Sequence, residues 1–389
     1  MTEVTSTDLL KKRRRYSLKI LISPAQFVMG IILAFLAGGV FLWIFHYNPV
    51  TVYNALFQGS FGSQRSIGET IMAATPLILG GLAVAVGFRC GLFNMGVEGQ
   101  IYLGGMVSVY VGYAWHLPVV IHLIVALLSG TLVGGIWGAI PGYLKARYKI
   151  HEVITTIMLN YIAMAVAAYM IEPGGPMKET GQLPESHQIL STAVLPNIWP
   201  GTRLSAGILI ALLVAVLIWI FLFKMRWGYK LRAVGFNSDA AEYAGISPKR
   251  MMVVSMAISG SLGGLAGAIE CLGLFHRLLE NFSPGWGWDS IAVALLGINH
   301  PLGVVVAAFV LGLLESGSTA MQMNANVSKN IVSILSAMII FFAAANQSLR
   351  PLIVRGVTQL TDRSADSKID LNPIFARGLD WISKRSKGS

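Results

Sequence analysis

The chain has 389 residues, of which 54% are hydrophobic and only 12% are charged. Soluble domains carry about 25% charged residues, so this composition excludes an ordinary soluble protein and indicates a polytopic membrane protein. The net charge of +11 does not indicate nucleic-acid binding, because most basic residues lie in tails and loops beside apolar runs. No metal site or cofactor is expected, since Cys90 and Cys271 form no CxxC motif.

The first half of the chain alternates apolar runs with polar connections. The basic segment 1–23 predicts a cytoplasmic N-terminus, followed by an uncleaved first span over 25–45. Residues 48–66 are polar and expected to lie outside, and 172–203 form the longest polar connection, an external loop. Five further spans are predicted over 67–88, from about 95 to 115, and over 118–144, 152–171 and 205–223.

The span that begins near Met95 carries polar residues into the membrane. From Ile101 to Trp115 there are too few residues for a span of about 20, so the helix must begin earlier and place Glu98 in or at the edge of the membrane. Asn94 and Glu98 are four residues apart and are expected to share a helix face. Intramembrane ionisable residues lean towards function; a buried structural pair is the alternative.

Residues 224–250 form the one long polar interruption between apolar runs in the middle of the chain. Its basic residues place it on the cytoplasmic side; they are Lys224, Arg226, Lys230, Arg232, Lys249 and Arg250. Asn237 precedes a short alanine-rich run that ends at Gly245, which predicts a capped helix stopped by a glycine with positive φ. Such a helix would dock a soluble partner; an ordinary ordered loop is the alternative.

The second half predicts a seventh span over 251–274, rich in small residues that favour close helix contact. The stretch GGLAVAVGFRCGLF from Gly80 and the stretch GGLAGAIECLGLF from Gly263 share both ends, which indicates an inverted repeat. Residues 286–298 are apolar but short, as in a half-helix. Spans over 302–316 and 330–345 bring the total to about ten, with both termini inside and a basic cytoplasmic tail over 347–389. The tail would be either loosely ordered or a short helix lying on anionic lipid.

Three stretches resemble the membrane permeases of ATP-binding-cassette importers. GYKLRAVGFNSDAAEYAGIS resembles their cytoplasmic coupling loop, while GLFNMGVEGQIYLGG and FSPGWGWDSIAVALLGINHPLG resemble motifs of the nucleoside and simple-sugar group, closest to the nucleoside type. The resemblance covers about 49–342. It implies an all-α bundle in a bacterial plasma membrane, with a permease domain over 24–346, broken or half helices and a cytoplasmic coupling helix.

The resemblance also implies partners and site residues. The partners would be a separate cytoplasmic ATPase, a second permease subunit and an extracytoplasmic substrate-binding lipoprotein or protein. The substrate path would use Phe93, Asn94, Glu98, Gln100, Asn160, Trp286, Trp288 and Asp289. The ATPase would contact Arg232, Gly235, Asn237, Ala240, Ala241, Glu242 and Gly245. The aromatic side chains would stack on a nucleobase. Alternatively, the tryptophans would anchor the protein at the membrane interface, and Asn160 would form hydrogen bonds between helices.

Two alternatives stay open at this point. A simple-sugar permease would have the same architecture with a different solute. An ion-coupled secondary transporter would use the carboxylates of Glu98, Glu270 or Asp289 as proton carriers, but it leaves the coupling segment without a role. The chain has no GxxxxGK[ST] motif, so ATP hydrolysis would belong to another polypeptide, and no catalytic constellation indicates an enzyme.

Overall fold

The computed structural model describes residues 32–345. The described residues divide into two units, 32–39 with 338–345, and 40–337. The packing and the sites described below lie in the second unit. The predicted basic segment 1–23 and the tail 347–389 fall outside the described residues.

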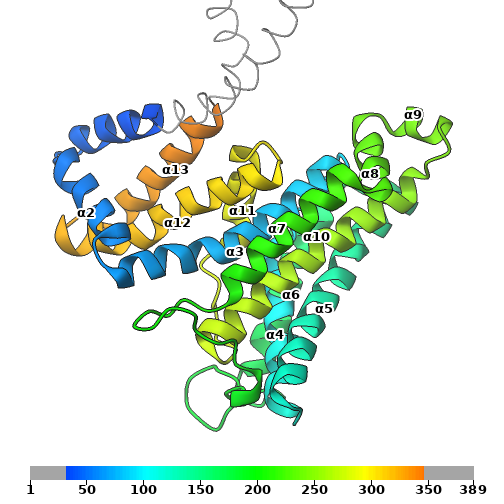
Figure 1. Ribbon diagram of the computed structural model, residues 1–389, viewed down its shortest axis with the longest axis horizontal. Helices are drawn as coiled ribbons and strands as arrows, with labels where there is room; N and C mark the ends of the chain where they lie inside the picture. The colour runs from blue at the N-terminus through cyan, green and yellow to red at the C-terminus, as the bar shows by residue number, and fades with distance from the viewer. Residues whose placement is uncertain (1–31, 346–389) are drawn as a thin grey trace, which may run out of the picture. The chain divides into compact units, whose positions relative to one another are not determined.

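The described residues are helical and contain no β-strand, which confirms the all-α class (Figure 1). An apolar helix covers Ile32–Ile44. The helices that follow are α2 (Pro49–Phe61), α3 (Gln64–Arg89), α4 (Val97–Ala114), α5 (Val119–Tyr148), α6 (Glu152–Ile171), α7 (Gly207–Lys224), α8 (Arg226–Phe236), α9 (Ser238–Tyr243), α10 (Pro248–Glu270), α11 (Trp286–Leu296), α12 (Pro301–Asn324) and α13 (Lys329–Ala345). A 3₁₀ turn covers Ser191–Ala193, and a π-helical turn, Cys271–Phe275, extends α10.

Six described helices are long and apolar enough to cross a membrane: α3, α5, α6, α7, α12, and α10 together with its π-helical turn. α11 and the helix over Ile32–Ile44 are apolar but shorter. These lengths confirm a polytopic helical protein and a half-length α11. The total of about ten spans stays a prediction.

The polar segment 48–66 is largely helical. It contains α2, and its location outside stays a prediction. The side chain of Asn48 accepts a hydrogen bond of 3.0 Å from the backbone N–H of Val50, and Pro49 occupies the first helical position. An Asn cap followed by Pro is a favourable helix start. α2 buries Val52 and Leu56 and packs against α12.

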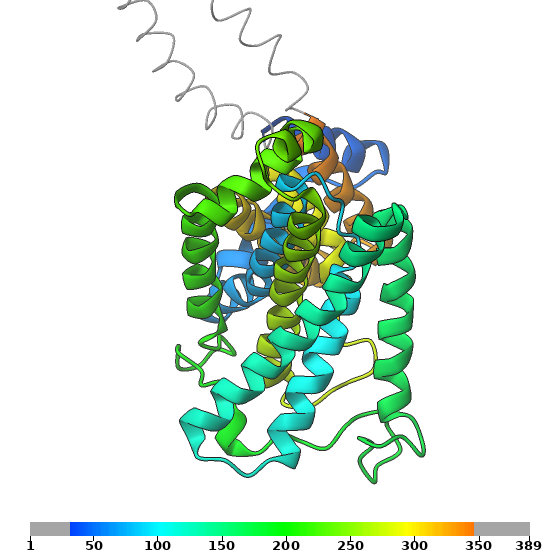
Figure 2. The same ribbon diagram turned by 90° about the vertical axis from the view of Figure 1, so that its right-hand side faces the viewer.

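The centre of the second unit is built from α4, α5 and α10, which approach one another at glycines (Figures 1 and 2). A Cβ on Gly134 of α5 would overlap the backbone oxygen of Gly260 of α10. A Cβ on Gly104 of α4 would overlap the backbone of Gly264. These contacts confirm the close packing predicted from the small-residue run, because only glycine lets helix backbones meet at this distance.

The contacts also follow the pattern of an inverted repeat. Gly80 of α3 faces Ser290 of α11, and its counterpart Gly263 of α10 faces Gln100 of α4. Likewise, α3 packs against α12 as α10 packs against α5. Exchanging α3, α4 and α5 with α10, α11 and α12 therefore preserves the main contacts among these six helices. This arrangement supports the repeat that the two GGLA stretches indicate, and it places α4 and α11 in equivalent positions.

Candidate functional site

A break in the chain between α3 and α4 organises the interior of the second unit. Residues 90–96 are not helical, and Gly91 has φ +76°. Asn94 lies in this break rather than on α4, so the prediction that Asn94 and Glu98 share a helix face was wrong. The reason is conformational: the left-handed turn at Gly91 ends one helix, and α4 begins only at Val97.

Two buried asparagines hold the break in place. Asn160 of α6 donates to the backbone oxygen of Met95 over 2.6 Å and accepts from the N–H of Gly99 over 2.8 Å. Asn94 donates to Ser259 of α10 over 2.7 Å and accepts from the N–H of Gly96 over 2.8 Å. These amides replace hydrogen bonds that a continuous helix would make, which non-helical backbone inside a membrane requires.

Gln100 completes the same network. Its Oε1 accepts from Asn94 Nδ2 over 3.2 Å, and its side chain faces Gly263. The structure thus brings together three predicted path residues, Asn94, Gln100 and Asn160, as one buried group around the break.

Glu98 links α4 to α11. Its side chain is in the first turn of α4, and the residue is only 3% exposed. Its Oε2 accepts a hydrogen bond of 2.6 Å from the N–H of Gly287 in the first turn of α11. A carboxylate at a helix N-terminus interacts favourably with the exposed N–H groups there. A Cβ on Gly287 would overlap the backbone of Glu98, so α4 and α11 meet N-terminus against N-terminus.

The remaining predicted path residues occupy different environments. Trp286 is buried and donates from Nε1 to Glu315 Oε1 of α12 over 3.2 Å, so it does not anchor at a membrane surface. Trp288 and Asp289, on the next positions of α11, are exposed. Phe93 packs edge-on against Phe88, with ring centroids 4.5 Å apart. Glu315 was not assigned a role from the sequence.

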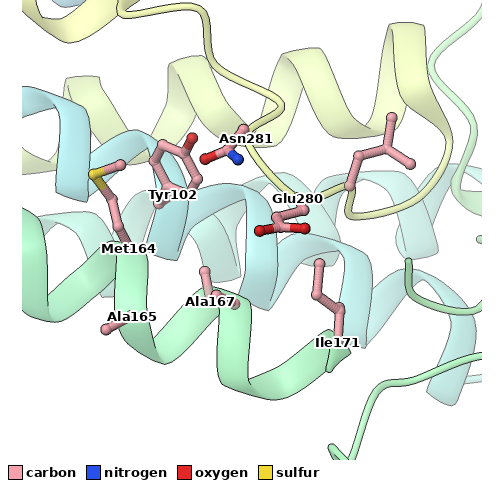
Figure 3. A pocket seen from close by; sticks show the side chains of 9 residues that line it. Tyr102, Met164, Ala165, Ala167, Ile171, Glu280 and Asn281 are labelled. Carbon is pink, nitrogen blue, oxygen red and sulfur yellow. The ribbon is translucent and has the colours of Figure 1, made fainter. Parts of the chain in front are cut away.

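A cavity of about 190 Å³ lies between α4, α6 and the connection that leads to α11. Figure 3 shows Tyr102 of α4 on one side, with Glu280 and Asn281 from the connection beside it. Met164 and Ile171 of α6 form the apolar wall. The sequence alone did not indicate this site, although Tyr102 belongs to the recognised stretch GLFNMGVEGQIYLGG, because the three polar residues meet only through the packing of α4 against the connection.

The polar segment 224–250 contains the predicted short helix. The Oδ1 of Asn237 accepts from the N–H groups of Asp239 and Ala240 over 3.0 and 2.9 Å, which caps α9. Gly245 follows with φ +77°. The capped helix with a positive-φ glycine stop is therefore confirmed.

The same segment contains a second helix that the sequence interpretation missed. α8 buries Leu231 and Val234, and its remaining positions are mostly polar or aromatic. Within the segment, Phe236 and Tyr243 are 87% and 94% exposed. Large exposed aromatic residues on a polar surface mark an interaction site.

The contact between Gly235 and Arg89 joins this segment to the break. A Cβ on Gly235 of α8 would overlap the backbone oxygen of Arg89 at the end of α3, and the backbone of Gly235 is also the nearest neighbour of Gly91. A displacement of α8 would therefore act on the break through backbone contacts alone, with no side chain between them.

A family model described as "Branched-chain amino acid transport system / permease component" matches residues 66–344, which include the break, the cavity and the polar segment. The chain belongs to this permease family. Members are membrane subunits without enzymatic activity of their own; they work with a separate ATPase and a substrate-binding protein. The chain is accordingly a multi-pass plasma-membrane protein. No solved structure matches it.

Curated relatives are similar over nearly their whole length. The chain is 45% identical to the guanosine ABC transporter permease protein NupP of Bacillus subtilis, over 83% of this chain and 93% of that protein. It is 36% identical to the nucleoside ABC transporter permease protein NupB of Lactococcus lactis, over 82% and 89%. It is 31% identical to the glucose ABC transporter permease protein TsgB13 of Haloferax volcanii, over 82% and 87%.

Proposed function

We propose that this chain forms the translocation path of an ATP-driven importer for nucleosides. The observation that carries the proposal is the direct backbone contact of Gly235 with Arg89 and Gly91, which connects a solvent-exposed docking segment to the break between α3 and α4. A secondary transporter has no use for such a connection, whereas an importer needs one between its ATPase and its path.

The similarity to NupP and NupB favours a nucleoside, and the cavity beside Tyr102 suits one. An aromatic ring offers a stacking surface for a base, while Glu280 and Asn281 offer acceptors and donors for ribose hydroxyls and base edges. A simple sugar, as the similarity to TsgB13 suggests, needs the polar groups but not the ring. The apolar wall from α6 favours the larger, partly aromatic solute.

The predicted path residues have several different roles under this proposal. One role is structural: hydrogen bonds from Asn94, Gln100 and Asn160 to other protein groups hold the non-helical conformation of the break. Glu98 holds α4 and α11 together and releases α11 when the path changes state. A third group consists of residues that can face the solute: Phe93, Trp288 and Asp289. Trp286 orients Glu315 through their hydrogen bond.

The partners occupy opposite ends of the second unit. The ATPase docks on α9, contacting Tyr243 and the predicted residues Asn237, Ala240, Glu242 and Gly245, all of which are exposed. Of the other predicted residues, Ala241 is buried, and Arg232 and Gly235 pack α8 against Phe223 and Arg89. The substrate-binding protein docks on the connection 172–203. Arg277 braces that connection through a 2.8 Å ion pair with Glu185. A second permease subunit, a paralogue of this chain, completes the path.

Reconstitution tests the proposal. The chain is placed in liposomes with its paralogue, ATPase and binding protein, and uptake of labelled guanosine, adenosine and glucose is measured with ATP inside. We expect ATP-dependent nucleoside uptake that a proton ionophore leaves unchanged. Preferential glucose uptake would establish the sugar alternative. Nucleoside entry driven by a proton gradient without the ATPase would overturn the importer and favour the ion-coupled alternative.

A further inference from the structure

A second cavity, of about 280 Å³, opens where α3 and α11 end beside α8. Its lining comes from the end of α3, from α8 and from the turn between α11 and α12, and includes Arg89, Arg232, Gly235, Phe236, Ile298 and Asn299. It is separate from the cavity beside Tyr102, with which it shares no lining residue.

Two guanidinium groups converge on this cavity. Arg232 and Arg89 both lie over the ring of Phe223, with their Cζ atoms 5.0 and 5.4 Å from its centroid. Arg89 is further fixed by a 2.9 Å hydrogen bond from its Nε to the backbone oxygen of Asn299. Stacking on an aromatic face orients a guanidinium while leaving its edge free to bind an anion.

The cavity contains buried polar atoms with no partner. Among the described residues neither arginine forms an ion pair with a carboxylate. The Nε of Arg232 and the Oδ1 of Asn299 are buried and make no hydrogen bond within that part of the chain. Burial lowers the pKa of His300 at the same turn, and the positive charge of Arg89 lowers it further. The cavity therefore holds positive charge, a donor and an acceptor that a bound group would satisfy.

The cavity lies at the ends of apolar helices, where phospholipid headgroups meet a membrane protein. Arg89 is the last residue of α3, Phe223 the last but one of α7, and Ile298 comes two residues after the end of α11. α7 is the most hydrophobic of the six spanning helices, and much of its surface is exposed, so it faces lipid. Basic and aromatic residues at the cytoplasmic ends of such helices lie at the headgroup level. Phe236 and Ile298 add exposed apolar surface beside the cavity.

We propose that this cavity binds the headgroup of an anionic phospholipid, with Arg89 and Arg232 on the phosphate and Phe236 and Ile298 against the acyl chains. Guanidinium groups bind phosphate oxygens through paired, charge-assisted hydrogen bonds, and such a bond satisfies the Nε of Arg232. A headgroup hydroxyl, as in phosphatidylglycerol, donates to Asn299 Oδ1. The bound lipid would fill the space beside the contact between Gly235 and Arg89 and so stabilise the docking segment.

An acidic side chain of the ATPase is the competing occupant. A carboxylate from a soluble partner would pair with the two arginines, but it would leave the apolar side chains of Phe236 and Ile298 exposed. The position at the ends of lipid-facing helices therefore favours the lipid.

Native mass spectrometry of the purified full-length chain tests the proposal. The chain is titrated with phosphatidylglycerol, phosphatidylcholine or inorganic phosphate, and retained molecules are counted. We expect one phosphatidylglycerol to bind more tightly than the rest, and Arg232→Gln to weaken it about tenfold, because each charge-assisted hydrogen bond contributes at least one decade of affinity. Arg232→Lys, which keeps the charge but lacks the paired N–H donors of a guanidinium, should bind with intermediate affinity.

Lys230→Gln is the matched control, because Lys230 is on the same helix, stacks on Trp227 instead and changes the net charge equally. Size-exclusion profiles establish that each variant is folded. Equal phosphatidylglycerol affinity in the native chain, Arg232→Gln and Lys230→Gln would overturn the proposal. So would inorganic phosphate competing at equal concentration, which indicates a free anion site. Loss of ATPase binding in Arg232→Gln with unchanged lipid affinity would assign the cavity to the ATPase.

Discussion

Glu98 and Gly287, 189 residues apart in the sequence, are joined by a hydrogen bond of 2.6 Å from the backbone of α11 to the carboxylate on α4. This bond connects the two helices that are equivalent in the predicted inverted repeat. Because Gly287 leaves no room for a Cβ, the contact is between backbones as well as through the side chain. A change in the spacing of α4 and α11 must break it.

Replacing Glu98 by Gln should reduce uptake roughly fivefold to tenfold. The amide oxygen of the new side chain still accepts a hydrogen bond from Gly287, but this bond is no longer charge-assisted and is weaker by about 1 kcal/mol. Uptake and co-purification with the ATPase are measured on the same preparation. If the complex fails to assemble, Glu98 is structural; if uptake is unchanged, it has no part in the path.

Replacing Gly235 by Ala should uncouple ATP hydrolysis from uptake. The new Cβ would overlap the backbone of Arg89, and relieving such a contact costs about 1–3 kcal/mol, so α8 must shift. ATP hydrolysis stimulated by loaded binding protein should fall towards its basal rate while the ATPase stays bound. Lys230→Ala is the control, because Lys230 is an exposed position of the same helix. Equal stimulation in both variants would contradict the proposed contact.

Replacing Gly245 by Val should weaken ATPase binding about fivefold to tenfold. A Cβ here has free space, so the effect is conformational: a β-branched residue at φ +77° costs at least about 1–2 kcal/mol, enough to displace α9. Gly245→Asn is the matched control, since Asn tolerates this backbone conformation. Binding is measured by surface plasmon resonance on the solubilised permease. The coupling role of α9 would be refuted by equal affinities.

Replacing Tyr102 by Leu should raise the guanosine concentration needed for half-maximal uptake about tenfold. The change removes a stacking surface worth about 1–3 kcal/mol per base and keeps the apolar volume. Met164→Leu, on the opposite wall of the cavity, should change it little. Glu280→Gln should act more strongly on nucleosides than on free bases, because the carboxylate is placed to accept from ribose hydroxyls. Unchanged kinetics in all three would place the solute elsewhere.

Single cysteines at positions 181 and 243 should react with impermeant reagents from opposite sides of the membrane. Both native cysteines are buried and are replaced first. Tyr243 is 94% exposed and lies on α9, whereas Gly181 belongs to the connection 172–203. Labelling of intact cells should modify position 181 only. Modification of both positions from outside would show that the assumed number of crossings is wrong.

Local features of this protein could be predicted from the sequence alone. The cap at Asn237, the stop at Gly245 and the spans of α5, α6 and α7 depend on residues within a few positions of one another. A helix cap is decided by one side chain and the two or three N–H groups that follow it. Hydrophobic length decides a span in the same local way.

Only the tertiary structure placed the polar groups of the interior. Asn94 bonds to Ser259, 165 residues away, and Asn160 to Met95, 65 residues away, so neither role follows from helical spacing. The expectation for Asn94 and Glu98 assumed a continuous helix, and the turn at Gly91 removed it. A polar side chain inside a membrane bonds to whichever backbone group is left unpaired beside it, and that depends on which helices pack together.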